Sequence, residues 1–314
     1  MTSSRKKILK RVGLSIILVL LSYILVSSVV TKVVYDNVFT RYDQEPMDYH
    51  SAHAQLIKTR KTYEFLSGDA NLTGYLYPAD SDKLVVLVPG YHASADNYLW
   101  QILHLNQSGI AVFCFDPTGS CQSEGESAIG FSQITFDCKA ALDMIINNQQ
   151  FGYQSLYLMG HSRGAYGICS LLNQGYPIEA AITVSGVNTC MDAIMQPVAE
   201  KVGFLAYTNY PYLWGYQSLL FGSEAVNTES AKEIAKSNLP VMIVQGVQDE
   251  VYPTHQYSLY HATQETNADN ISYYICEKPG QNGHTNLLFD ADGTQNRALM
   301  EAVCRFIHQN ERKN

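Results

Sequence analysis

Three residues that could together carry out nucleophilic catalysis follow one another along this chain. Ser162 lies in a Gly-His-Ser-Arg-Gly pentapeptide, Asp249 in a later loop and His284 in a glycine-rich loop after that. A serine hydroxyl is a weak nucleophile that needs a base to accept its proton, and an acid must orient that base. The sequence therefore predicts Ser162 as nucleophile, His284 as general base and Asp249 as the orienting acid.

The pentapeptide around Ser162 sits between a short apolar run, Ser155–Met159, and a helix-compatible stretch, Ala165–Asn173. A serine at a sharp strand-to-helix turn projects its hydroxyl above the sheet, and glycines two residues before and after it relieve the crowding. This context favours a nucleophile over the alternative, a glycine-bounded turn without chemistry.

The acidic residue of the set should lie just past the carboxyl end of a strand. Asp249 follows the apolar run Val241–Gln245 at that position. Glu250 is the alternative, because a shift of one residue changes which side chain points inward.

His284 stands between the apolar run Ile271–Cys276 and the last predicted helix, Gln295–Asn310. Of the nine histidines in the chain, it alone has this placement. The order serine, acid, histidine is that of one known arrangement of catalytic triads.

Acyl transfer also requires two donors that stabilise a developing oxyanion. The backbone N–H of Arg163, directly after the serine and at the start of a helix, is the first candidate. The backbone N–H of Tyr91, in the loop after the apolar run Leu84–Val88, is the second, with His92 as its alternative.

Strand-like segments that could hold these residues recur along the chain and alternate with segments of helical spacing. Two strand-like segments, Thr62–Leu66 and Leu72–Tyr77, are separated by a hairpin signal. Continuous apolar runs then alternate with helical spacing, as in a parallel sheet covered on both faces. The runs are Leu84–Val88, Ile110–Phe115, Ser155–Met159, Ala180–Ser185, Val241–Gln245 and Ile271–Cys276. In such sheets the chemistry lies beyond the carboxyl ends of the strands, where all three predicted residues fall.

From about Tyr63 to Asn310 the sequence resembles the α/β-hydrolase superfamily, particularly bacterial membrane-anchored members. The resemblance rests on the loop Val-Pro-Gly-Tyr at 88–91, the Gly-His-Ser-Arg-Gly turn, the acid loop at 246–251 and Asn-Gly-His at 282–284. It implies a mostly parallel α/β sheet with helices on both faces and a small helical cap at about 187–238.

The function that this resemblance implies is hydrolysis of an acyl bond in a small-molecule substrate. We expect a carboxylic ester, while a peptide substrate of the same triad and a catalytically silent surface-binding module stay as alternatives. The mechanism needs water alone as second substrate. We therefore expect no cofactor, no metal and no obligate protein partner.

Aromatic residues are concentrated in the expected cap. One hypothesis is that they wall a pocket for an acyl group, and the equally favoured alternative is that they pack the cap onto the core. They are Phe204, Tyr207, Tyr210, Tyr212, Trp214, Tyr216 and Phe221.

The charge is unevenly distributed along the chain. The net charge is −8, but six of the 21 Lys and Arg residues and none of the 29 Asp and Glu residues precede Tyr35. The remainder is strongly acidic and would repel phosphate backbones, so we expect no nucleic-acid partner.

An uncharged segment, Val12–Thr31, follows the early basic cluster. Twenty helical residues rise about 30 Å, the thickness of a bilayer's hydrocarbon core. With basic residues on the cytoplasmic side, this segment predicts a single-pass membrane anchor and a catalytic domain outside the cytoplasm. The alternative is a signal peptide cleaved near Ser27 and Ser28, which would give a secreted protein. We thus expect a tip and anchor at 1–34, a stalk at 35–61 and a catalytic domain at 62–314.

Overall fold

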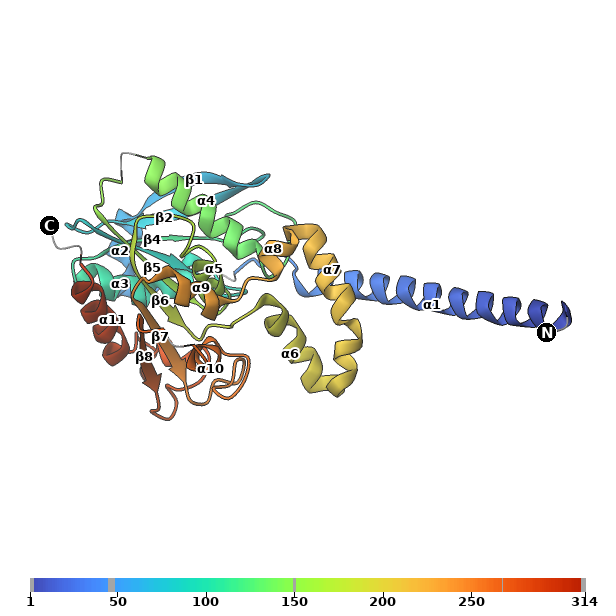
Figure 1. Ribbon diagram of the computed structural model, residues 1–314. Coiled ribbons are helices and arrows are strands. Elements are labelled where there is room, and N and C mark those ends of the chain that lie inside the picture. Colours follow the sequence, from blue (N-terminus) through green and yellow to red (C-terminus); the bar gives the residue numbers. More distant parts are fainter. Residues whose placement is uncertain (1–2, 45–48, 149–150, 267, 312–314) are drawn as a thin grey trace.

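The computed structural model describes residues 3–44, 49–148, 151–266 and 268–311 (Figure 1). Its centre is an eight-stranded sheet with the order β1-β2-β4-β3-β5-β6-β7-β8. β1 and β2 form an antiparallel hairpin, β2 pairs antiparallel with β4, and all other neighbours are parallel. The strands are β1 Lys61–Ser67, β2 Ala70–Tyr77, β3 Lys83–Val88, β4 Ala111–Phe115, β5 Ser155–His161, β6 Ile178–Val184, β7 Val241–Gly246 and β8 Ile271–Cys276. These bounds agree with the predicted runs to within a few residues, and the predicted fold class is confirmed.

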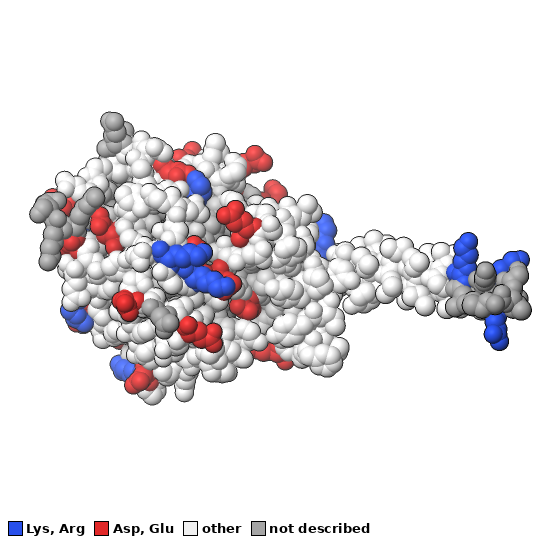
Figure 2. Space-filling view, in the orientation of Figure 1, with Lys and Arg blue, Asp and Glu red and all other residues white. Residues whose placement is uncertain are grey.

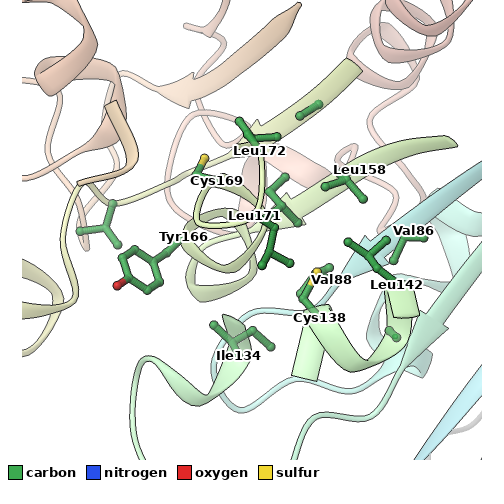
Figure 3. Close-up of a cluster of buried hydrophobic side chains, with 14 of the residues drawn as sticks. Val86, Val88, Ile134, Cys138, Leu142, Leu158, Tyr166, Cys169, Leu171 and Leu172 are labelled. Carbon is green, nitrogen blue, oxygen red and sulfur yellow. The ribbon is translucent and has the colours of Figure 1, made fainter. Parts of the chain in front are cut away.

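Helices cover both faces of the sheet, so apolar side chains from alternate strand positions enter two separate cores. One core lies between the sheet and helices that include α4 and α5, and Figure 3 shows part of it around Val86, Val88 and Ile134. The other lies under α3 and α11. The helices outside the cap, after the N-terminal one, are α2 Ala54–Thr59, α3 Leu99–Gln107, α4 Gln133–Asn147, α5 Arg163–Cys169, α10 Leu259–Gln264 and α11 Arg297–Gln309, with short 3-10 turns η1 Ser51–His53, η2 Ala95–Tyr98 and η4 Asn286–Leu288. Burial on both faces explains why the parallel strands are continuously apolar.

A helical insertion connects β6 to β7, where a cap was expected. It consists of α6 Cys190–Val202, η3 Gly203–Asn209, α7 Tyr210–Phe221, α8 Ser223–Val226 and α9 Ser230–Ser237. In Figure 1, α6 and α7 lie on the side of the molecule from which the N-terminal helix extends.

The N-terminal helix α1, Ser3–Val38, projects away from the sheet (Figure 1). Its segment Lys10–Val38 is long and apolar enough to cross a membrane, by length and composition. The helix continues past residue 34, and its end is not a free linker, because Tyr35 and the following Phe39 are buried in the main core.

The segment after α1 lies on the surface of the sheet domain. Thr40 and Tyr42 form isolated bridges with the loop after β4, and the Arg41 guanidinium donates to backbone carbonyls of the same loop. Leu56 in α2 is buried in the second core. Parts of the expected stalk, 35–61, therefore pack against the domain, while the division of the chain at residues 34 and 61 stays a prediction.

Candidate active site

Ser162 occupies the turn between β5 and α5. Its backbone angles, φ 54° and ψ −117°, are rare for a residue with a side chain. Such strain costs on the order of 1–3 kcal/mol and persists only where the surroundings impose it. Here the Ser162 N–H is held by the carbonyl oxygen of Val184, 2.8 Å away in the neighbouring strand β6.

The two glycines that flank this turn are required by close backbone contacts. A Cβ atom on Gly160 would lie 2.5 Å from the carbonyl carbon of Gly164. A Cβ atom on Gly164 would overlap the carbonyl oxygen of Val88 at the end of β3. The Gly-x-Ser-x-Gly pattern therefore reflects steric exclusion on both sides of the serine.

The structure brings the three predicted residues into one hydrogen-bonded line. His284 Nε2 lies 2.9 Å from Ser162 Oγ. On the other side of the ring, His284 Nδ1 lies 2.9 and 3.0 Å from the two carboxylate oxygens of Asp249. All three residues are buried.

Glu250, the alternative acid, lies next to the site but not at the histidine ring. Its carboxylate accepts a hydrogen bond from the backbone N–H of His284 at 3.0 Å. Asp249 thus contacts the ring of His284, and Glu250 contacts its backbone.

The Asp249 carboxylate is well supplied with hydrogen-bond donors. Oδ1 accepts from the backbone N–H groups of Val251 and Tyr252 at 2.9 and 2.8 Å, and Oδ2 from the Gln245 side chain at 3.0 Å. Burial raises the pKa of Asp249, but the hydrogen bond and charge of His284, together with these backbone donors, outweigh burial and lower the pKa below its usual value. The carboxylate is therefore ionised and suited to orient His284.

The two predicted oxyanion donors lie in segments that border the serine. Arg163 is the first residue of α5, and its side chain is buried with Nε donating to the carbonyl oxygen of Phe131 at 2.8 Å. Gly90 approaches so closely that an added Cβ would lie 3.4 Å from the Ser162 Cβ, which places the loop carrying Tyr91 and His92 beside the serine. The donor roles of Arg163 and Tyr91 stay predictions.

His161, the residue before the serine, was missed as a member of the site. Its Nδ1 lies 2.9 Å from the hydroxyl of Tyr98, and its Nε2 lies 3.2 Å from the backbone oxygen of His284. Ser185 also donates to that oxygen, at 2.8 Å. Burial is the main cause that lowers the pKa of His161 to about 3, and the nearby His284 ring is the second. His161 is therefore a neutral positioning residue. Because it fills a variable position of the pentapeptide, only its proximity to Ser162 could have indicated this role.

The cap aromatics do not form a single group in the structure. Phe204 is largely exposed, Tyr212 and Tyr216 contact α1, and Phe221 stacks on Phe136 of α4. The hypothesis of an acyl pocket walled by these residues stays untested. Within the residues that the structure describes, no group of three or more His, Cys, Asp or Glu side chains could hold a metal.

Comparisons with known proteins agree with this architecture. The model of the serine aminopeptidase family S33 matches residues 79–234, about half of the chain. An esterase from Pyrococcus furiosus superposes with a TM-score of 0.64 at 18% identity, over 86% of this chain and 98% of that one. Est1E from Butyrivibrio proteoclasticus, solved with ferulic acid, gives 0.57 at 17% identity, over 79% and 98%. Proline iminopeptidase from Mycobacterium smegmatis gives 0.53 at 11% identity, over 80% and 98%. A comparison with curated protein sequences finds no match.

The sheet order, the strained serine turn and these similarities together define a class of protein. The chain belongs to the α/β-hydrolase superfamily. Its solved neighbours include both esterases and a peptidase, so the comparisons support a hydrolase without distinguishing the bond that it cleaves.

Proposed function

We propose that this protein is a serine hydrolase that cleaves carboxylic esters through an acyl-enzyme on Ser162. The observation that carries the proposal is the buried line from Asp249 through His284 to Ser162, with distances of 2.9 Å at both links. The esterases among the solved neighbours support an ester as the substrate.

In the proposed reaction, Ser162 Oγ attacks the ester carbonyl carbon while His284 Nε2 accepts the hydroxyl proton. Asp249 accepts the hydrogen bond from Nδ1–H and stabilises the imidazolium that forms. The oxyanion is stabilised by the backbone N–H groups of Arg163 and Tyr91. His284 then returns the proton to the departing alkoxide, and the alcohol leaves.

Deacylation repeats these steps with water in place of the hydroxyl of the nucleophile. His284 accepts a proton from water as the oxygen attacks the acyl carbon, and it then protonates Ser162 Oγ as the acid product is released. No cofactor or metal takes part in either half of this reaction.

The second candidate is a serine peptidase with the same catalytic residues. It is favoured by the match to the serine aminopeptidase family and by the proline iminopeptidase among the neighbours. A catalytically silent binding module is the third and least supported candidate, because it would leave the strained serine turn and the buried hydrogen-bonded line without a purpose.

We further propose that α1 anchors the protein in a membrane, with the basic N-terminal tip in the cytoplasm and the sheet domain outside it. The apolar segment and the asymmetric basic residues support this orientation.

Labelling with a fluorophosphonate probe tests the nucleophile. The full-length protein in detergent should label, whereas Ser162→Ala and His284→Ala should not, and Ser170→Ala in the same region should label like wild type. Paired p-nitrophenyl esters and aminoacyl p-nitroanilides then separate esterase from peptidase. A folded wild-type protein that does not label would contradict the proposal and favour the binding module.

A further inference from the structure

The apolar segment of α1 has clear limits. Arg11 precedes it and Lys32 follows it, so the uncharged part runs from Val12 to Thr31. At 1.5 Å per residue these residues rise about 30 Å, which is the full thickness of a hydrocarbon core. If α1 crosses a bilayer, Thr31 marks the boundary on the side of the sheet domain.

The cap helix α7 lies beside α1 on both sides of this boundary. Tyr216 donates to Asp36 at 2.9 Å, just beyond Thr31. The Tyr212 ring, however, packs 6.2 Å from the ring of Tyr23, eight residues before Thr31 and therefore about 12 Å deeper along the helix. Figure 1 shows α7 next to the end of α1 that meets the sheet domain.

This contact limits how the molecule can sit in a membrane. Suppose that the bilayer surface lay just before Tyr23, so that α7 stayed in water. Only residues 12–22 of α1 would then remain inside the bilayer, about 17 Å of helix for a core of about 30 Å. A 17 Å apolar length is far too short, and the remaining apolar turns of α1 would be exposed to water. The cap must therefore enter the bilayer for α1 to cross it.

The composition of the cap at this level fits such an environment. From Val202 to Ser223 there is no Asp, Glu, Lys, Arg or His. Phe204 and Leu219 are 79% and 81% exposed, and Leu205 in the same segment is 55% exposed, so several large apolar side chains are exposed within one short segment. Four tyrosines and Trp214 lie in the same segment, and these residue types are enriched at membrane interfaces. Figure 2 shows that the surface around the base of α1 is largely uncharged.

We propose that the cap segment Val202–Ser223 is a membrane-docking surface, inserted into the outer leaflet of the same bilayer that α1 crosses. The inference rests on the proposed anchor and not on the identity of the catalytic residues. Its occupant is lipid, because α1 and the cap are packed side by side and share one apolar surface. The depth of about 12 Å is close to that of helices that lie in the interface plane.

Quenching of tryptophan fluorescence by brominated acyl chains tests this placement in the full-length protein. Phe204→Trp and Leu219→Trp are each made with Trp214→Phe, so that Trp100 on α3 is the constant background. The matched control is Leu66→Trp in the same background, because Leu66 is 68% exposed on the β1–β2 hairpin. The proteins are reconstituted in phosphatidylcholine vesicles with and without bromine on the acyl chains.

We expect the added fluorescence of the two cap variants to fall at least twofold in brominated vesicles, while that of the Leu66 variant stays unchanged. Equal quenching at all three positions would overturn the proposal. Unchanged fluorescence of the two cap variants would also overturn it, and this is the result expected if a second copy or another protein covers the cap. Fluorophosphonate labelling and resistance to carbonate extraction in the same vesicles show separately whether the hydrolase and the anchor proposals hold.

Discussion

The candidate active site and the cap are stabilised in opposite ways. Around Ser162 and His284 the polar groups are buried and hydrogen-bonded, and glycines permit backbone contacts that no other residue would allow. The cap segment around α7 has aromatic contacts on one side and large exposed apolar side chains on the other. The first region is thus specified by interactions within the chain, whereas the second has a surface that the chain itself does not cover.

The largest difference between these regions should appear at two glycines. Gly164→Ala places a Cβ onto the carbonyl oxygen of Val88, and rigid backbone on both sides cannot move away. We expect this variant to fold poorly or to lose activity at least a hundredfold, as measured by ester hydrolysis and thermal unfolding.

Gly215→Ala in α7 is the matched control, because nothing lies within 4 Å of the added Cβ. Helix propensity alone should stabilise this variant by up to about 1 kcal/mol. Equal losses of activity and thermal stability in Gly164→Ala and Gly215→Ala would contradict the distinction between the two regions.

The next largest effect should come from Asp249→Asn, which preserves the shape of the side chain. An amide cannot stabilise the imidazolium and favours the wrong tautomer of His284, so we expect kcat to fall about 10²–10⁴-fold with little change in KM. Steady-state kinetics on a soluble ester measure this.

Glu250→Gln is the control for the charge at this loop. It removes the charge of a carboxylate whose contact with His284 is to the backbone N–H and not to the imidazole ring. A tenfold or smaller loss is expected, and a larger loss than for Asp249→Asn would reverse the assignment of the acid.

The same contrast explains how much could be predicted from the sequence. The strands are continuously apolar because they are buried on both faces, and the Gly-x-Ser-x-Gly turn has one steric solution, so the fold and the positions of Ser162, Asp249 and His284 could be predicted. The sequence favours Asp249 but leaves Glu250 open as the alternative, since the distinction depends on the direction of one side chain at the end of β7.

Other features depend on contacts between distant segments. The role of His161 arises from Tyr98 in η2 and from the backbone of His284, and neither pairing leaves a periodic signal. The burial of Tyr35 and Phe39 in the core could not be predicted either, because two apolar residues after a predicted membrane anchor are also compatible with a linker. The cap aromatics were ambiguous because a pocket, a core and a lipid-facing surface select the same residue types.

An intermediate effect is expected at the junction of α1 with the core. Phe39 is buried and packs 5.5 Å from the Tyr91 ring, so Phe39→Ala leaves a cavity beside the predicted oxyanion loop. We expect a loss of about 3 kcal/mol in the free energy of unfolding, measured by denaturation in detergent.

Phe204→Ala is the corresponding change in the cap and removes a side chain that makes few contacts within the protein. Its stability in detergent should change by less than about 0.5 kcal/mol. A large loss would indicate that Phe204 is covered by protein and not by lipid.

A smaller effect than that of Phe39→Ala is expected from the pH dependence of stability that buried His161 gives to the protein. Its pKa is about 3 in the folded protein against an ordinary 6.5. Between these values the unfolded chain binds a proton that the native state does not, so stability falls as the pH falls, by about 1.4 kcal/mol per pH unit.

His161→Gln removes the titration but can still donate to the carbonyl of His284. The lowered pKa of Asp249 also reduces stability in acid, but only near and below the ordinary carboxyl value of 3.8. From pH 7 to pH 5 the variant should therefore lose about 2 kcal/mol less stability than wild type. Thermal unfolding across this range measures the difference, and parallel curves would show that His161 is protonated or accessible in the native state.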